Sequence, residues 1–177
     1  MTHQRNDDRR DENNKSREHK MSNEIWMISN RQPWPEALVL GLITSKTRSF
    51  AVNLPPVGAT VFLHASVALW RDWKSMWWVK EHGIDMASIQ RGGVVAIATV
   101  KAKGRTSEVM PREDKNFFMC EDCSGTWDCA DEQTIVFENV QPIPFVQCKG
   151  SLVPTRKLPI ELVAWLKKHP LDGFYGL

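Results

Sequence analysis

The apolar residues of this chain occur in short runs that are separated by turn-forming residues. These runs are rich in β-branched and aromatic residues, which is typical of strands. A Pro-Pro pair and Gly58 force a turn between the second and third runs. The pattern predicts a sheet of five to seven short strands, drawn from residues 24–29, 48–52, 59–66, 92–103, 133–140 and 143–153.

Two shorter helices are expected beside this sheet. Pro35 suits the first turn of a helix and Gly41 suits its end, so we expect a helix over residues 34–42. A C-terminal helix is expected within residues 158–169, with its apolar side turned inward: Leu162, Trp165 and Leu166. Strands with helices inserted between them predict an α+β fold, most simply a small mixed sheet curled toward a barrel.

Residues 67–83 are predicted to form one longer helix that ends at Gly83. At 100° per residue, five apolar residues share a face that we expect to be core: Leu69, Trp70, Trp73, Met76 and Trp77. Trp78 falls on the polar face, between Arg71 and Lys74. Two interpretations stay open for its ring. It packs under the loop of residues 81–92, or it serves as a platform on which a base stacks.

Composition narrows the class of protein. At 177 residues the chain is expected to be one domain, residues 23–177, preceded by a tail. Residues 1–22 are highly charged and almost without apolar side chains, so we expect them to be disordered. No apolar run approaches the ~20 residues of a membrane-spanning helix, and the first twenty residues lack the apolar core of a secretory signal. We therefore expect a cytoplasmic protein with no membrane partner.

The four cysteines raise the question of a metal site. Cys120, Cys123 and Cys129 form a C-x2-C-x5-C pattern, and Cys148 lies further along the chain. A C-x2-C pair is half of a tetrahedral zinc site, but the other two cysteines are widely separated. We expect thiols, or a loose thiol cluster, rather than a structural zinc, and no cofactor.

Several motifs in this order resemble the ASCH domain, a branch of the PUA-like superfamily. They are "QPW" at residues 32–34, Gly41, Arg48 before Phe50, "FLHAS" at 62–66, "GGVVAIATV" at 92–100 and "FENVQPIPFVQCKGSL" at 137–152. The resemblance covers roughly residues 24–160. It implies a compact β-barrel with a cleft beside the first helix. It also implies RNA or DNA binding, and in a few members hydrolysis at nucleic acids or modified nucleosides.

The chain departs from the charged motif of that family, which reads Gly-x-Lys-x-x-Glu-x-Arg, with Thr for Glu in an amidohydrolase branch. Aligned on Gly41 without a gap, the lysine position is Ile43 and the acid position is Lys46. Only the arginine is kept, as Arg48. A catalytic lysine needs a titratable amine, which isoleucine lacks, so we expect no catalysis.

The preferred interpretation is a protein that binds RNA, or single-stranded or modified DNA, through a cleft. Net charge is only +2, so such binding would rely on a local site rather than on bulk charge. Eight tryptophans could stack on bases while Lys46 and Arg48, on or near a strand edge, hold phosphates. The candidate binding residues are Gln32, Trp34, Lys46, Arg48, Phe50, His64, Ser66 and Trp78.

A purely structural role is an alternative interpretation for these residues. Trp34 could equally be a core ring, and a strand-end histidine such as His64 is more often structural than a base. Two other functions stay open. One is a hydrolase of RNA or modified nucleosides that uses Lys46 and His64 as proton carriers. The other is a protein-interaction module whose cleft takes a peptide.

Overall fold

The computed structural model of the chain describes residues 24–48, 53–109 and 132–171. The charged tail, Phe50 and the cysteines at 120, 123 and 129 lie outside these ranges. Within them, five strands form one sheet in the order β1-β3-β4-β5-β2. The strands are β1 (Ile25–Gln32), β2 (Ser45–Arg48), β3 (Thr60–Leu69), β4 (Gly93–Arg105) and β5 (Gln133–Gln147).

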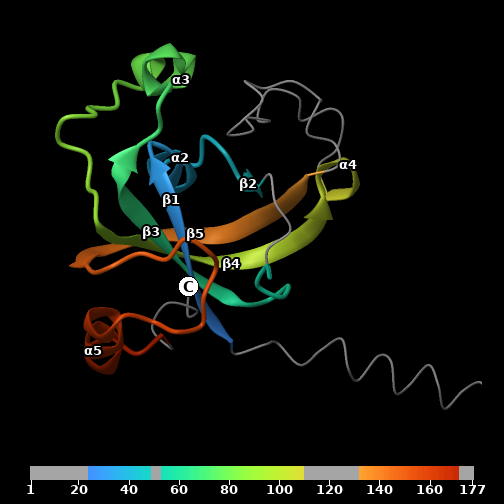
Figure 1. Cartoon of the computed structure of the whole chain (residues 1–177), viewed down its shortest axis with the longest axis vertical. Helices are drawn as coiled ribbons and strands as arrows, with labels where there is room; N and C mark the ends of the chain where they lie inside the picture. The colour runs from blue at the N-terminus through green and yellow to red at the C-terminus, as the bar shows by residue number, and fades with distance from the viewer. Residues whose placement is uncertain (1–23, 49–52, 110–131, 172–177) are drawn as a thin grey trace, which may run out of the picture.

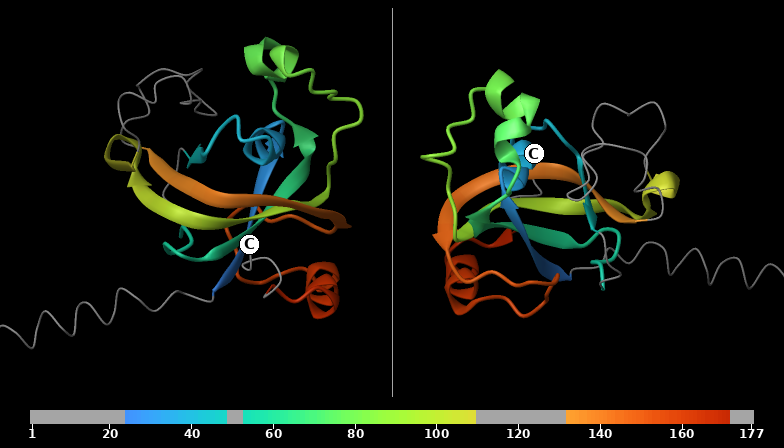
Figure 2. Two further views of the ribbon diagram at one scale, coloured as in Figure 1. Left: turned by 180° about the vertical axis from the view of Figure 1, so that it is seen from behind. Right: turned by 45° about the horizontal axis from the view of Figure 1, so that its top comes forward.

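The sheet is mixed and strongly curled. β1 runs parallel to β3, and the other neighbouring pairs are antiparallel. The two longest strands, β4 and β5, sweep together through a wide arc (Figures 1 and 2). Their pairing shifts register at three places, and such irregularities bend a strand and increase its twist. The predicted α+β fold with a barrel-like sheet is thus confirmed as a curled half-barrel. The two strands expected at 133–140 and 143–153 are one long strand.

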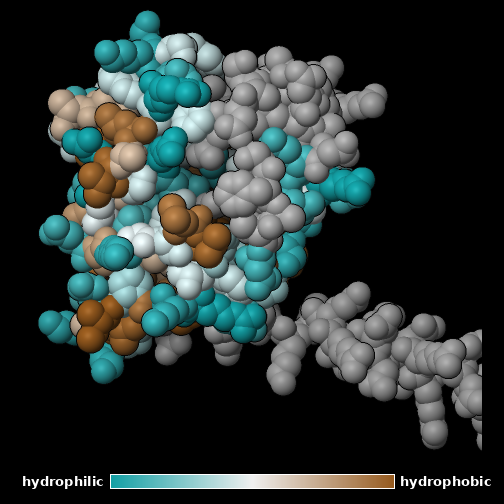
Figure 3. All heavy atoms as spheres, viewed as in Figure 1, coloured by the Kyte–Doolittle hydropathy of each residue, from teal (hydrophilic) through white to brown (hydrophobic). Residues whose placement is uncertain are grey.

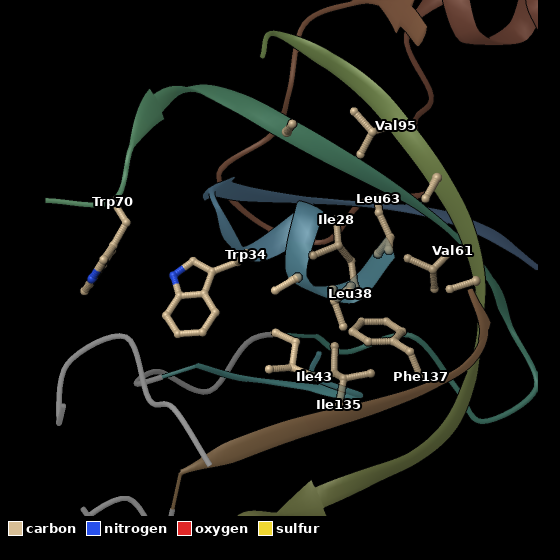
Figure 4. Packing of buried hydrophobic residues seen from close by; sticks show 14 of the residues in the cluster. Ile28, Trp34, Leu38, Ile43, Val61, Leu63, Trp70, Val95, Ile135 and Phe137 are labelled. Carbon is tan, nitrogen blue, oxygen red and sulfur yellow. The ribbon is translucent and has the colours of Figure 1, made fainter. Parts of the chain in front are cut away.

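Helix α2 (Trp34–Val39) lies inside the curl of the sheet (Figures 1 and 4). It contacts β1, β3, β4 and β5. The helix has Pro35 in its first turn and is followed after Leu40 by Gly41, whose φ of +68° suits a residue without a side chain. The expected end signals were therefore right, although the helix stops three residues before the predicted boundary at 42.

Helix α5 (Ile160–Lys168) covers the opposite face of the sheet (Figure 1). Its Leu162 is fully buried among Met27, Phe62 and other residues of that face. Trp165 meets the Phe62 ring edge-on, with 6.4 Å between the ring centroids. The inward side predicted for this helix is confirmed. None of the described helices is long and apolar enough to span a membrane.

The long helix predicted over residues 67–83 is wrong. β3 continues to Leu69, and the chain then forms a short 3-10 helix, η1 (Trp73–Ser75), before α3 (Trp77–Glu81). Met76 between them is extended, with φ −71° and ψ 110°. One extended residue breaks the 100° spacing, so the face derived from a continuous helix does not apply.

The two adjacent tryptophans of α3 are consequently exchanged relative to prediction. Trp78, expected on the polar face, is only 3% exposed, whereas Trp77, expected in the core, is 59% exposed. Trp78 joins the main core cluster together with Trp70, Met76 and Val79. The core interpretation of Trp78 agrees with this placement, and an exposed stacking platform at Trp78 is excluded.

This exchange predicts opposite effects for two neighbouring alanine substitutions. Trp78→Ala removes a buried ring and should lower the free energy of unfolding by about 3–5 kcal/mol. Trp77→Ala should change it by less than about 0.5 kcal/mol, since surface substitutions cost little. Urea denaturation followed by far-UV circular dichroism measures both. Equal losses in the two variants would contradict the assignment of Trp78 to the core.

Candidate nucleic-acid interface

Trp34 begins α2 and is the centre of a tryptophan cluster. Its ring centroid lies 6.5 Å from that of Trp70 in an edge-on arrangement and 6.0 Å from that of Trp78. Figure 4 shows the side chains of Trp34 and Trp70. The side chain is 1% exposed, so the structure places Trp34 in the core. Its indole Nε1–H nevertheless has no hydrogen-bond acceptor among the residues that the structure describes. A buried donor of this kind is uncommon, because an unmade hydrogen bond in the interior costs free energy.

Lys46 lies directly against this ring. Its Nζ is 4.6 Å from the centroid of Trp34, a distance at which an ammonium is attracted to the face of an indole. Lys46 lies on β2, an edge strand that begins at Ser45 rather than at the predicted residue 48. Lys46 is nevertheless only 1% exposed. It pairs in register with Ile135 of β5 and shares that residue's core-facing side. Lys46 is thus a buried cation rather than one on the surface.

A chain of threonine hydroxyls fixes the orientation of β2. Thr47, the next residue along the strand, places its Oγ1 2.9 Å from Oγ1 of Thr134. Thr134 lies 2.7 Å from Oγ1 of Thr106, which donates to the carbonyl oxygen of Glu132. All three threonines are buried. Because successive strand residues face opposite ways, anchoring Thr47 on this side turns Lys46 toward Trp34.

Gln32 is used within the fold. Its side-chain nitrogen donates to the carbonyl oxygen of Gln90 at 2.8 Å, and its side-chain oxygen accepts from the backbone nitrogen of Glu36 at 3.2 Å. The residue is fully buried. Gln32 therefore holds the first turn of α2 and the loop before β4 in place. Arg48 ends β2, two residues after Lys46, and its backbone pairs with Gln133.

His64 and Ser66 are not brought together with Trp34 and Lys46. His64 faces the α5 side of the sheet, where its Nε2 lies 3.1 Å from the carbonyl oxygen of Cys148. Because a carbonyl only accepts, Nε2 carries the proton. Ser66 is partly exposed near the end of β3, and its hydroxyl donates to the carbonyl oxygen of Ala68.

A glycine packs directly on the His64 ring. A Cβ at Gly150 would lie 2.5 Å from Cε1 of His64 and 2.7 Å from Oγ of Ser29, so no side chain fits there. Ser29 in turn accepts a hydrogen bond from the backbone nitrogen of Ser151. His64 thus holds residues 148–151 against the sheet, which is the structural role weighed for it from sequence.

Solved structures of similar shape identify the fold. A crystal structure of ASCH from Zymomonas mobilis matches with a TM-score of 0.53 and 15% identity, over 82% of this chain and 96% of that one. A serine-to-alanine variant of that protein matches with a TM-score of 0.54 and 15% identity, again over 82% and 96% of the two chains. This chain has the fold of an ASCH domain. No protein-family model and no curated protein matches the chain.

The structure shows where the residues at the positions of the ASCH charged motif lie. Ile43, at the family's lysine position, is buried in the same core cluster as Trp34 and is 5% exposed. The amine in this region comes instead from Lys46. Among the residues described, no group of three or more His, Cys, Asp or Glu could hold a metal, and Cys148 is a buried free thiol.

Sequence reasoning missed several members of this site. Trp70 was placed in the core, but its edge-on contact with Trp34 depends on the turn after β3. Arg31, whose guanidinium lies 5.8 Å from the centroid of Trp70, was not singled out. Glu36 was not considered either, and its partial burial raises the pKa of the carboxyl above its usual value. For Arg31 and Glu36, proximity in sequence to Trp34 was the only available signal.

The buried histidine predicts how stability depends on pH. Burial lowers the pKa of His64 below its ordinary value of 6.5, and the hydrogen bond to Cys148 offsets only part of this. The unfolded chain therefore binds this proton more readily than the folded one. The contribution of neutral His64 to stability is complete above pH 6.5 and is lost as the pH falls below it.

Urea unfolding between pH 8 and pH 5 tests this expectation. The loss of stability below pH 6.5 should be reduced in His64→Gln, whose amide can still donate to Cys148 but does not titrate. His82→Gln, at an exposed histidine, should keep the wild-type profile. An unchanged profile in His64→Gln would assign the acid sensitivity to other groups.

Proposed function

We propose that this chain is a nucleic-acid-binding ASCH-fold protein that takes RNA, or single-stranded or modified DNA, at the Trp34–Lys46 site. The observation that carries the proposal is the Lys46 ammonium seated 4.6 Å from the Trp34 ring centroid. An aromatic face beside a cation is the combination that single-stranded nucleic acids require. Trp34 and Lys46 are each 1% exposed, so a ligand reaches them only when the side chains that cover them move aside. A base then stacks on the ring, and the cation neutralises phosphate.

Other groups around Trp34 support the same ligand chemistry. The unsatisfied indole N–H of Trp34 would suit an acceptor such as a base carbonyl or a phosphate oxygen. Arg31 is exposed and lies over Trp70, so a second cation–aromatic pair adjoins the first. Arg48 follows Lys46 on the same strand and is the one charge of the family motif that this chain keeps. The resemblance to ASCH proteins, which are associated with nucleic acids, agrees with this proposal.

Hydrolysis is the less favoured function. The alternative of a hydrolase that uses Lys46 and His64 as proton carriers needs both residues to act on one substrate. Lys46 contacts Trp34 on the inner face of the sheet, whereas His64 packs toward Gly150 on the α5 side. Two proton carriers on opposite faces of a sheet cannot serve a single reacting bond, because general acid–base catalysis requires hydrogen-bond reach. With Ile43 at the lysine position, the proposed protein binds its ligand without turning it over.

Binding measurements with two matched variants test the proposal. Fluorescence anisotropy with labelled RNA and single-stranded DNA should show that Arg48→Ala weakens binding by about 10- to 100-fold, as expected for loss of a charged hydrogen bond. Lys101→Ala, at an exposed position of β4, should stay within about threefold of wild type. Equal losses would mean that only diffuse charge acts.

A mononucleotide screen separates the remaining functions. Saturable binding without turnover supports the proposal. Turnover of RNA or a modified nucleoside that disappears in Lys46→Met would make the protein a hydrolase. Absence of any nucleotide or oligonucleotide binding would favour a protein-interaction module instead.

A further inference from the structure

Helix α5 carries apolar side chains on two of its sides. Its inner side packs on the sheet through Leu162, which is fully buried. On the side away from the sheet, Ile160 is 79% exposed and Val163 is 38% exposed, and Ala164 is exposed beside them. A surface helix is normally apolar toward the core and polar toward water. The apolar outer side of α5 therefore indicates a second contact.

The outer residues follow one another at helical spacing. Positions i, i+3, i+4 and i+7 line one side of an α-helix, and here they form a stripe that we call the outer stripe of α5: Ile160, Val163, Ala164 and Lys167. The carbon stem of a lysine packs on apolar side chains while its ammonium stays in water. Figure 3 shows hydrophobic residues at the lower left of the molecule, where Figure 1 places α5.

The charges of α5 are arranged so that the helix complements itself. Glu161 lies in the first turn and Lys168 in the last, and both are exposed. The two residues are seven positions apart, so they lie on the same flank of the outer stripe, about 10 Å from each other along the helix axis. Neither has an oppositely charged residue three or four positions away within α5, where pairs on a helix surface meet.

A second copy of α5 that packs antiparallel satisfies both the stripe and the charges. With a two-fold axis at the middle of the stripe, Val163 of one copy meets Ala164 of the other, and Ile160 meets the stem of Lys167. The same flanks of the two helices lie side by side, so Glu161 of each copy comes within reach of Lys168 of the other. The opposed helix dipoles favour the same arrangement.

Other occupants of the outer stripe fit less well. An acidic peptide or an anionic lipid surface would bring negative charge against Glu161, whereas a second copy brings Lys168. The position of α5 also leaves room for such a pair. The helix covers the face of the sheet opposite to α2, so contact through α5 leaves the Trp34–Lys46 sites of both copies clear (Figure 1).

We infer that the outer stripe of α5 is a self-association surface through which two copies of this chain form an antiparallel, two-fold symmetric dimer. The helix has only nine residues. Stable interfaces use about 20–30 residues a side, so this dimer is a weak one, with a Kd between about 10 μM and 1 mM. The inference does not depend on the ligand of the Trp34–Lys46 site.

A charge exchange between two variants tests the inference. In sedimentation equilibrium of the full chain, Glu161→Lys and Lys168→Glu should each weaken self-association by at least about fivefold, because each turns two attractions into two repulsions. An equimolar mixture of the two variants should associate about as tightly as wild type, since both attractions return in the mixed pair. This recovery requires the two residues to lie on different copies.

A pair of serine substitutions tests the apolar part of the stripe. Ile160→Ser should weaken self-association by about 10-fold or more, because the symmetric contact loses two buried side chains. Val67→Ser is the matched control, at an apolar residue of β3 that is 72% exposed. It should leave self-association unchanged. Far-UV circular dichroism checks that all variants remain folded.

Three results would overturn the inference. One is a wild-type chain that stays monomeric up to about 1 mM, or a mixture of the charge variants that associates no better than either alone. Another is a dimer that appears only after residues 172–177 are deleted, which would mean that the end of the chain itself covers the stripe. The third is a monomer that cosediments with phosphatidylserine vesicles unless it carries Ile160→Ser, which would assign the stripe to a lipid surface.

Discussion

The burial of α2 in the concave face of the sheet is the constraint on which the rest of this structure depends. A five-stranded sheet this curled exposes an apolar inner face, and α2 fills it through Trp34, Ala37 and Leu38. Trp34 then provides the surface on which other parts of the chain converge. Trp70 and Trp78 pack on it from the segment after β3, and Lys46 approaches its face from β2. Core and candidate site are therefore the same cluster, so a substitution at Trp34 cannot affect one without the other.

Local signals predicted the parts of the fold that local physics decides. The ends of α2 followed from Pro35 and Gly41, because a fixed φ and a positive φ are properties of single residues. The inward side of α5 followed from the spacing of Leu162 and Trp165. The prediction for residues 67–83 was wrong because it also relied on local signals alone. Its spacing fits a helix, but pairing of β3 with β1 extends the strand to Leu69, and that long-range contact outweighs local preference.

The candidate site was less predictable than the fold, because its residues are assigned to faces by strand register. Lysine is a residue type that usually lies on the surface, and only the pairing of Lys46 with Ile135 shows that it faces inward. His64 and Leu63 are adjacent, yet they face opposite layers, one toward Gly150 and the other into the cluster around Trp34. A one-residue change of register would exchange them, and nothing local to "FLHAS" decides between the two arrangements.

The threonine chain behind Lys46 has a direction as well as a position. Glu132 contributes a carbonyl oxygen, which only accepts, so the single hydroxyl proton of Thr106 must point to it. Thr134 must then donate to Thr106, and Thr47 to Thr134, because each hydroxyl has one proton. One carbonyl at the start of β5 thereby sets the orientation of three hydroxyl dipoles in series. The hydrogen atom of each hydroxyl points away from β2. The oxygen atom, which is the negative end of each dipole, therefore lies on the side toward β2. The strand that holds a buried cation is thus backed by a row of dipoles whose sign favours positive charge.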